Sequence, residues 1–463
     1  MFRMLWLVAL STVAVLAQTA SVTGRVTDST GAAIEGARLV VTASATGVES
    51  ATETNVEGVY SIPALQPGVY TVSVSKSGFR SVRQTDLQLQ VQQIARLDLR
   101  LDVGAVTESI EVQAQSVLLE SETSTVGQVI QSKQVTELPL LGRNTYALAM
   151  LVPGVRASGG VNQLVVDQIS TVSYSINGQR SNANEFLLDG APNSAASQNQ
   201  PVINANPEMV QEFKVETNGY SAEYGRAAGG VFNVVTRSGS NQLHFSAYEF
   251  FRNDKLNAND YFANSAGRAR PPFKFNQFGG TIGGPVLIPK LYDGRNRTFF
   301  FVSVELVRFI QGITFNATTP RPEQLAGDFS NLRNAAGVPV TIYDPATTTA
   351  NAAGGFTRTA FPGNIIPRNR FNPVASRILA FMPAPNAQGT ATGTNNYVRT
   401  DANKVDKDTV SYRVDHSFNQ ANRLFARYSA DDSPWIRAAV YGSDNPASPV
   451  AGPQTFGRRN TVV

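Results

Sequence analysis

The chain contains no cysteine and only two histidines, His244 and His416, among its 463 residues. The lack of cysteine excludes disulfides, thiolate metal sites and cysteine nucleophiles. Serine and aspartate are common, but the sequence shows no partners that would complete a catalytic triad. We therefore expect a protein that is not an enzyme, with no catalytic residues, no metal site and no cofactor.

Charged residues are also scarce. They make up 16% of the chain, against about 25% in an average soluble protein. The net charge is +4, and no cluster of lysine and arginine interleaved with aromatic residues occurs. Such a cluster is the usual footprint of nucleic-acid binding, so we expect no nucleic-acid partner.

A short apolar run opens the chain. Arg3 precedes residues 4–17, which are almost entirely apolar, and Val15-Leu16-Ala17 offers a cleavage site with small residues. This order of charge, apolar run and cleavage site predicts a signal peptide at residues 1–17 and export from the cytoplasm. A membrane anchor is the weaker alternative, because the run is shorter than the roughly 20 residues that a spanning helix needs.

Residues 21–102 alternate between β-rich runs and turns. The runs are residues 21–27, 37–43, 49–54, 59–63, 68–75 and 94–101. Short strands at this spacing, separated by Gly, Pro and Asp, predict a small antiparallel β-sandwich. Within it, Tyr70, Val72 and Val74 would form one buried face.

Several motifs in this part resemble the carboxypeptidase regulatory-like (transthyretin-like) domain. They are Gly24-Arg25-Val26-Thr27-Asp28, Gly31, Gly36-Ala37-Arg38-Leu39-Val40, Gly58-Val59-Tyr60 and Pro67-Gly68-Val69-Tyr70. The resemblance implies a non-catalytic sandwich related by fold to carbohydrate-binding modules. It does not imply a peptidase, because the segment has no cluster of His and Glu that could bind zinc.

Residues 105–238 mix short strands with short helices. The pattern predicts strands at 107–114, 212–216 and 230–236, and helices at 131–137, at 144–151 and after Asn206-Pro207. Short elements of both kinds, rich in Gly and Asn, favour a compact α+β domain over a dinucleotide-binding fold. The pair Asp189-Gly190 is interpreted as a turn rather than as a catalytic carboxylate.

From residue 241 onward, long segments alternate apolar and polar side chains. In residues 410–418, Val410, Tyr412 and Val414 alternate with polar residues that include Arg413 and Asp415. Eleven of the 25 phenylalanines fall within residues 240–309, as in an aromatic belt at a membrane surface. None of these segments approaches the roughly 20 apolar residues of a membrane helix. The alternation instead predicts the first strands of an antiparallel transmembrane β-barrel at 241–463.

Residues 310–407 show no sustained period, and we interpret them as a long external loop of this barrel. About five barrel strands can be recognised before Val463. An unclosed sheet leaves edge hydrogen bonds that lipid cannot satisfy. We therefore expect the sequence to be a fragment truncated at its C-terminus.

Residues 105–310 resemble TonB-dependent receptors of the Oar-like type, with a plug domain at 105–238. The motifs are Leu138-Pro139-Leu140, Gly142-Arg143-Asn144, Leu151-Val152-Pro153-Gly154-Val155, Asn177-Gly178-Gln179-Arg180, Leu187-Leu188-Asp189-Gly190, Ala222-Glu223-Tyr224-Gly225-Arg226, Gly229-Gly230-Val231 and Asn233-Val234-Val235-Thr236. The resemblance implies a mainly β protein of the Gram-negative outer membrane that imports an extracellular substrate with energy relayed by TonB.

Residues 107–114 match the pattern of the TonB box, the segment that pairs with periplasmic TonB in this family. The residues expected to bind TonB are Glu108, Ser109, Ile110, Glu111 and Val112. An exposed extended segment of this kind can add as a strand to a partner's sheet. The alternative is that the segment is an ordinary strand of the plug.

Two other functions stay open at this point: a structural or adhesion protein of the outer membrane, and a secreted carbohydrate-binding module. The substrates that the family allows include siderophores, cobalamin and carbohydrates. The sugar-module-like front domain favours glycans.

Overall fold

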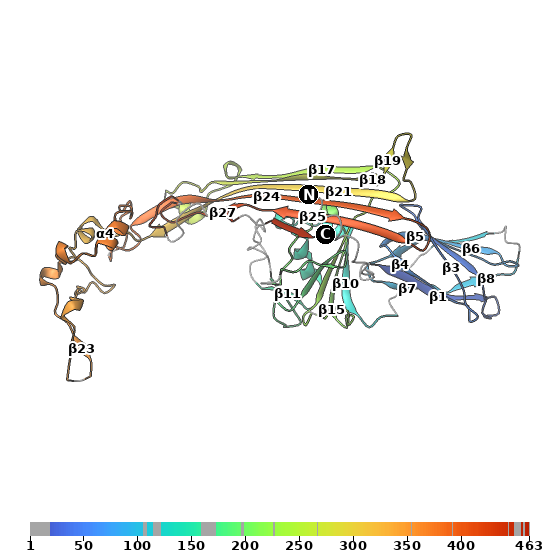
Figure 1. Cartoon of the computed structure of the whole chain (residues 1–463), viewed down its shortest axis with the longest axis horizontal. Coiled ribbons are helices and arrows are strands. Elements are labelled where there is room, and N and C mark those ends of the chain that lie inside the picture. The colour runs from blue at the N-terminus through green and yellow to red at the C-terminus, as the bar shows by residue number, and fades with distance from the viewer. Residues whose placement is uncertain are drawn as a thin grey trace, which may run out of the picture.

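The structure is a computed structural model that describes residues 19–104, 109–113, 122–158, 173–195, 199–225, 227–265, 267–352, 354–390, 392–442, 444–448, 455–456 and 459–462. The predicted signal peptide lies outside these residues. Strands dominate and form three bodies (Figure 1), which confirms the mainly β class. We call them the sandwich (β1–β9), the plug (β10–β16) and the barrel sheet (β17–β28 without the two separate hairpins β19–β20 and β22–β23). The plug lies beneath the middle of the barrel sheet and the sandwich beneath one end.

The sandwich packs two sheets together. Its strands are β1 (Ala20–Asp28), β2 (Arg38–Ala43), β3 (Glu49–Glu53), β4 (Val59–Leu65), β5 (Gly68–Ser75), β6 (Ser81–Leu89), β7 (Ile94–Arg96), β8 (Leu99–Leu101) and β9 (Ser109–Gln113). One sheet has the order β4-β1-β7, with β8 also on β1, and the other the order β3-β2-β5-β6-β9. Tyr70, Val72 and Val74 are buried in the core between the sheets, as the alternation predicted.

The sandwich is not purely antiparallel, so that part of the prediction was wrong. Strand β1 pairs in parallel with β7 and β8, and β6 pairs in parallel with β9. Strand β6 was not predicted at all. Its register with β5 shifts between Tyr70 and Val72, and Asp86 has a φ of 60°, so the period of two is interrupted in mid-strand.

The plug has a mixed sheet of order β10-β15-β16-β13-β14 around an aromatic core. Its elements are β10 (Val126–Gln131), α1 (Ser132–Glu137), η1 (Leu141–Arg143), η2 (Thr145–Leu151), β11 (Val155–Ser158), β12 (Ser173–Ile176), β13 (Glu185–Leu188), β14 (Ala191–Pro192), η3 (Pro207–Met209), β15 (Val210–Asn218) and β16 (Val231–Thr236). Phe186 stacks on Phe232 with ring centroids 4.6 Å apart, and Tyr146 meets both rings edge-on. The predicted helix at 144–151 is a 3₁₀-helix, η2, capped by Asn144.

The barrel sheet consists of long antiparallel strands in the order β17-β18-β21-β24-β25-β28. Its strands are β17 (His244–Asn253), β18 (Phe273–Pro285), β21 (Thr298–Ala317), β24 (Tyr397–Ser417), β25 (Arg423–Asp432), β26 (Trp435–Ile436), β27 (Thr455–Phe456) and β28 (Arg459–Val462). Between them lie η4 (Asp254–Leu256), α2 (Tyr261–Ser265) and a separate hairpin of β19 (Leu287–Ile288) and β20 (Tyr292–Asp293). Arg413 and Asp415 are buried toward the plug, whereas Tyr412 and Val414 are exposed on the other face. The predicted alternation of faces in this strand is therefore confirmed.

The strands β21 and β24 are longer than the sequence indicated. They pair from Thr298 and His416 to Ala317 and Tyr397, so the predicted limits of the loop at 310–407 were wrong. The residues of each extension find their partners between 80 and 100 residues away along the chain, which no local pattern reveals. The remaining connection, 318–396, holds α3 (Pro322–Leu325), η5 (Pro345–Thr347), β22 (Thr349–Ala350), β23 (Phe356–Thr357), η6 (Pro362–Asn364), η7 (Arg368–Arg370) and α4 (Pro373–Leu379). Within the described ranges, no helix is long and apolar enough to cross a membrane.

Candidate functional site

A buried carboxylate, Asp189, lies where the plug meets the barrel sheet. It follows β13 in a left-handed turn, with a φ of 50°, and is 1% exposed. Its Oδ1 accepts a hydrogen bond from the backbone N–H of Thr236 at 2.8 Å, and its Oδ2 accepts one from the Thr236 hydroxyl at 2.7 Å. The end of β16 therefore holds the carboxylate in place.

Two arginines of the barrel sheet converge on this carboxylate. Arg413 on β24 places Nη1 3.2 Å from Oδ1 of Asp189, and Arg427 on β25 places Nε 2.7 Å from Oδ2. The two arginines are cross-strand partners, and Arg427 also donates to the carbonyl of Leu188 at 3.0 Å. Neighbouring strands of the barrel sheet thus clamp one side chain of the plug.

A second carboxylate, Asp415, joins all three bodies. It pairs with Arg413 at 2.8 Å on its own strand. Its Oδ2 accepts a hydrogen bond from the hydroxyl of Ser238, just after the plug, at 2.7 Å. Its Oδ1 accepts one from the Gln66 amide of the sandwich at 3.0 Å.

These four side chains form a buried cluster with no net charge, because its two carboxylates, Asp189 and Asp415, are matched by two guanidinium groups, Arg413 and Arg427. Its side chains are between 1% and 11% exposed. Such groups lose their hydration, and only close partners offset that cost. Removing one partner from a buried pair leaves an unpaired charge and costs about 3–5 kcal/mol. The cluster therefore ties the position of the plug to the barrel sheet.

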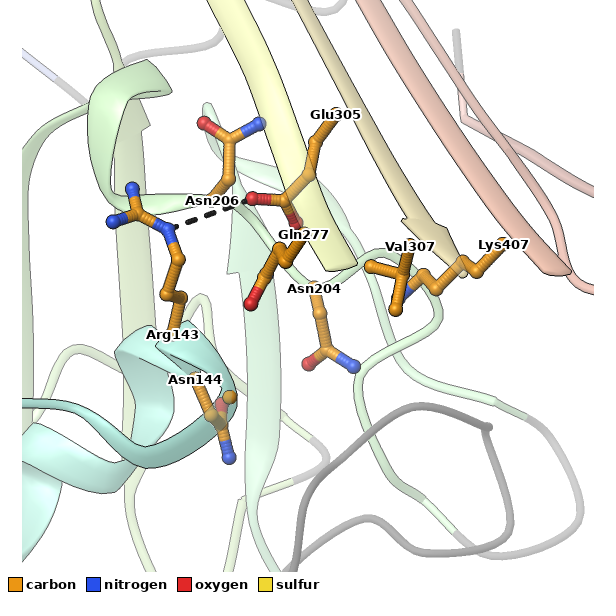
Figure 2. Close-up of a pocket in the computed structure, with 9 residues that line it drawn as sticks. Arg143, Asn144, Asn204, Asn206, Gln277, Glu305, Val307 and Lys407 are labelled. Atoms are coloured by element: carbon orange, nitrogen blue, oxygen red, sulfur yellow. Dashed lines mark ion pairs between the residues drawn. The ribbon is translucent and has the colours of Figure 1, made fainter. Parts of the chain in front are cut away.

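A second charged group also joins the plug to the barrel sheet (Figure 2). Arg143 of the plug pairs with Glu208 of the plug and places Nε 3.7 Å from Oε2 of Glu305 on β21. Tyr248 donates its hydroxyl to Glu305 at 2.9 Å. The guanidinium of Arg143 also lies 4.3 Å from the ring centres of Tyr248 and Phe250. Plug and barrel sheet are again joined by a paired arginine.

A small polar cavity adjoins this second group. Its volume is about 20 Å³, and it is lined by Gly142, Arg143, Asn144, Asn204, Asn206, Gln277, Glu305, Val307 and Lys407. A cavity of this size holds about one water molecule. It is therefore a polar gap in the interface and too small to be a substrate pocket.

Among the described residues, two neighbouring residues of the sandwich, Val91 and Gln92, form hydrogen bonds to the plug. The backbone N–H of Val91 donates to Oε2 of Glu212 at 2.8 Å, and the Gln92 amide donates to the hydroxyl of Tyr224. Burial raises the pKa of Glu212 to about 7, against the opposing effects of the Val91 hydrogen bond and of Lys214. The carboxyl at this contact therefore titrates near neutral pH.

The sandwich also touches the turns at one end of the barrel sheet. Gln420, in the β24–β25 turn, donates to Oε2 of Glu49 at 3.3 Å. Arg423 donates to the carbonyl of Glu49 at 3.2 Å, and Asn241 donates to the carbonyl of Thr46 at 2.8 Å. The sandwich is therefore docked at the end of the sheet where the connections are short (Figure 1).

Three family models match consecutive parts of the chain. They are the carboxypeptidase regulatory-like domain at residues 21–102, the TonB-dependent receptor plug domain at 120–231 and the outer membrane beta barrel domain at 235–463. The TonB-dependent transporter Oar of Myxococcus xanthus is 29% identical over 298 residues, which are 60% of this chain. The chain belongs to the TonB-dependent receptors. The barrel and plug models place this receptor in the outer membrane.

The match with Oar covers 26% of that protein, so the receptor chain spans about a quarter of its curated relative. Solved structures that resemble it include the outer membrane transporter YddB of Escherichia coli, at 14% identity and a TM-score of 0.38, covering 67% of this chain and 33% of that one. The ferric enterobactin receptor PfeA of Pseudomonas aeruginosa shows 12% identity and a TM-score of 0.36, covering 72% and 36%.

The residues predicted to bind TonB lie apart from both charged clusters of the receptor. Ser109, Ile110, Glu111 and Val112 belong to β9, which pairs with β6 of the sandwich. Glu108 lies outside the described residues. The alternative reading as a plug strand does not hold for β9, because its pairing is with the sandwich.

The charged clusters of the receptor were not predicted as a site. Asp189 was interpreted as a turn, and it does form one, but its side chain also binds two arginines. The available signal was the inward face of β24, where Arg413 and Asp415 alternate with apolar residues. Charges on a face turned toward another domain need partners there, and Asp189 is one of them.

Proposed function

We propose that this receptor imports an extracellular substrate across the outer membrane with energy that TonB relays from the inner membrane. The observation that supports this most is the charged interface in which Arg413 and Arg427 of the barrel sheet hold Asp189 of the plug. A domain interface built on polar contacts allows relative movement more readily than an apolar one. A plug held in this way stays closed at rest and can be displaced by an applied force.

The arrangement of the connections supports a direction for transport. In outer-membrane barrels the short turns face the periplasm and the long loops face outward. The β24–β25 turn and the sandwich lie at one end of the barrel sheet, and the connection at 318–396 extends beyond the other (Figure 1). Substrate would bind on the outer side, and the sandwich would face TonB in the periplasm.

We propose residues 107–114 as the contact with TonB, with Glu108, Ser109, Ile110, Glu111 and Val112 as its core. Strand addition needs an extended segment with free backbone donors and acceptors. The edge strand β9 has the required extended conformation.

For the substrate we propose a carbohydrate oligomer, with ferric siderophores as the second class to be screened. The choice rests on the sandwich, which matches the carboxypeptidase regulatory-like domain; that resemblance implies a fold related to carbohydrate-binding modules. We propose no enzymatic step, since the buried carboxylates Asp189 and Asp415 are each neutralised by arginine.

Deleting residues 107–114 tests the proposal. Uptake should fall to background while the protein still fractionates with the outer membrane as a heat-modifiable species. Ile110→Pro should act like the deletion, because proline cannot donate a strand hydrogen bond. Val56→Pro is the matched control, since Val56 lies in an exposed turn of the sandwich whose geometry accepts proline.

Uptake that persists after the deletion would contradict coupling through this segment. The adhesion alternative would be favoured if cells carrying the unmodified receptor attached to surfaces but transported no substrate.

A further inference from the structure

The connection between β21 and β24 carries most of the net charge of the chain. We call residues 318–396 the outer connection, and the structure describes all of it except Ala353 and Ala391. It contains six arginines, three carboxylates and neither lysine nor histidine, so its net charge is +3, against +4 for the whole chain. A surface with such an excess of positive charge attracts anions.

The carboxylates of the outer connection are already engaged within it. Asp344 accepts two hydrogen bonds from the guanidinium of Arg370, at 2.6 and 2.8 Å. The other two carboxylates contact an arginine or a turn of their own segment. Three exposed arginines, by contrast, have no carboxylate partner among the described residues: Arg358, Arg368 and Arg377. Their charge is available to a ligand.

The outer connection is folded, and one side chain ties three of its runs together. The Asn364 amide donates to the carbonyl of Phe329 at 2.7 Å and to that of Val340 at 2.9 Å. Its oxygen accepts a hydrogen bond from the backbone N–H of Ile342 at 2.6 Å. The arginines are therefore presented from a defined surface.

Asp344 joins the runs that carry two of these arginines. Its backbone N–H donates to the carbonyl of Thr359 at 2.9 Å, and Thr359 directly follows Arg358. Its carboxylate holds Arg370, two residues beyond Arg368. Arg358 and Arg368 thus come from two runs that a single residue connects.

Exposed aromatic rings lie on the same folded segment. Tyr343 is 52% exposed and Phe356 is 74% exposed. The sandwich differs, because Tyr60 and Tyr70 are buried, Phe79 is half-buried, and the large apolar residues that it exposes are aliphatic. Sugar rings pack their C–H faces against aromatic faces, which are electron-rich. The outer connection therefore offers a glycan better packing surfaces than the sandwich does.

The position of the outer connection suits a ligand on its way to the plug. It extends beyond the end of the barrel sheet opposite the sandwich, and β23 lies below the line of the barrel strands, as the plug does (Figure 1). Asn396 holds the base of the connection closed by accepting from the N–H of Thr319 at 2.8 Å and donating to its carbonyl at 2.9 Å. A ligand approaching the plug from this end meets the outer connection first.

We propose that the outer connection binds an acidic oligosaccharide, with Arg358 and Arg368 holding sugar carboxylates and Tyr343 and Phe356 packing against sugar faces. The inference rests on the proposed function and narrows its substrate class from carbohydrates in general to glycans that contain uronic acids. Arginine binds a carboxylate through two parallel hydrogen bonds. An oligomer fits better than a single sugar, because the four side chains come from separate runs.

Binding of polygalacturonate to the full chain in detergent tests the proposal. Dextran serves as the neutral glycan, and polyglutamate carries carboxylates without sugar rings. We expect polygalacturonate to bind at least about tenfold more tightly than either. Its affinity should fall about tenfold as the NaCl concentration rises from about 0.05 to about 0.5 M. Equally tight binding of dextran would overturn the role of the arginines, and equally tight binding of polyglutamate would overturn the sugar specificity.

Removing the two arginines locates the site. Arg358→Gln with Arg368→Gln should weaken polygalacturonate binding about tenfold. The matched control, Arg38→Gln with Arg100→Gln, removes the same charge from two exposed positions of the sandwich and should leave the affinity within about twofold. A loss confined to the sandwich variant would move the site to the sandwich. Equal losses in both variants would show that net charge alone governs binding, and either result overturns the proposal.

Removing the two rings tests the other half of the site. Tyr343→Ala with Phe356→Ala deletes exposed side chains, so the fold should be kept. We expect polygalacturonate to bind about fivefold more weakly, while the weak binding of polyglutamate stays the same. Unchanged affinity for polygalacturonate would show that the rings do not contact the sugar.

Failure of this inference can be told apart from failure of the proposed function. Binding needs no energy coupling, so deletion of residues 107–114 should leave the affinity for polygalacturonate unchanged. If the acidic glycan binds at this site and cells never import it, the proposed import falls and the binding site stands. If the receptor imports another substrate and does not bind polygalacturonate, this inference falls alone.

Discussion

The plug has two interfaces, and they differ in what holds them together. Toward the barrel sheet, Asp189 is clamped by Arg413 and Arg427 in a nearly dry cluster. Toward the sandwich, the contact rests on single hydrogen bonds such as that from the Val91 N–H to Glu212. A hydrogen bond contributes about 1 kcal/mol net, whereas breaking a buried ion pair costs about 3–5 kcal/mol. The sandwich contact should therefore open under a smaller force than the barrel contact.

The comparison also indicates a division of roles. An interface that must stay closed until work is done on it benefits from charges that cannot be left unpaired. An interface that only has to keep two domains aligned needs a defined geometry and little stabilising free energy. Asp415 lies where the two meet, since it accepts hydrogen bonds from Ser238 and Gln66 and pairs with Arg413.

Asp189→Ala should have the largest effect. It leaves Arg427 buried with no carboxylate partner among the described residues, and it removes the acceptor of the Thr236 N–H. We expect the free energy of unfolding to fall by about 3–5 kcal/mol, measured by urea titration of the receptor in detergent. The control is Asp408→Ala, which breaks the exposed pair with Arg308 and should cost less than about 1 kcal/mol. Equal effects of the two variants would contradict the difference between buried and exposed pairs.

Glu212→Gln should have an intermediate effect that depends on pH. Burial raises the pKa of Glu212 from 4.5 to about 7, so between these values the folded state holds a proton that the unfolded state releases. Stability from this group is then complete below about pH 4.5 and is lost as the pH rises to about 7. At about 1.4 kcal/mol per pH unit the loss reaches roughly 3 kcal/mol.

Thermal unfolding between pH 4.5 and 7.5 measures this dependence. The unmodified receptor should lose stability across the window, and Glu212→Gln, which keeps the acceptor for the Val91 N–H, should lose less. Parallel pH profiles of the two proteins would show that Glu212 does not titrate in this range.

Arg423→Ala should have the smallest effect. Its side chain donates to the carbonyl of Glu49 and to the hydroxyl of Ser50, both in β3 of the sandwich. The loss should be about 1 kcal/mol, seen as a small shift in urea unfolding and a faster release of the sandwich by limited proteolysis. A loss as large as that of Asp189→Ala would show that the sandwich contact is as strong as the barrel contact.

The sequence allowed the faces of the barrel strands to be predicted because that information is local. In β24, the alternation of Arg413 and Asp415 with Tyr412 and Val414 identifies the inner face without a partner strand. The same logic failed for β6, where the bulge opposite Tyr70 and the positive φ of Asp86 interrupt the period. It also failed at the outer ends of β21 and β24, which stabilise each other across a long connection.

The charged cluster could not be assembled from the sequence for a related reason. Asp189 lies 224 residues from Arg413 along the chain, as their hydrogen bond records. The local pattern Asp-Gly explains the turn completely and leaves no unexplained feature. The position of β9 was hidden in the same way: its strand character was predicted, whereas its place beside β6 depends on the fold of the sandwich.

The most direct test of the account is a double-mutant cycle between Asp189 and Arg427, the plug carboxylate and its barrel partner. The free energies of unfolding of Asp189→Ala, Arg427→Met and the double variant are compared with that of the unmodified receptor in detergent. We predict a coupling free energy of about 2–3 kcal/mol, because each single variant leaves a buried charge that the double variant removes. A coupling below about 0.5 kcal/mol would contradict the claim that buried charges hold the plug against the barrel sheet.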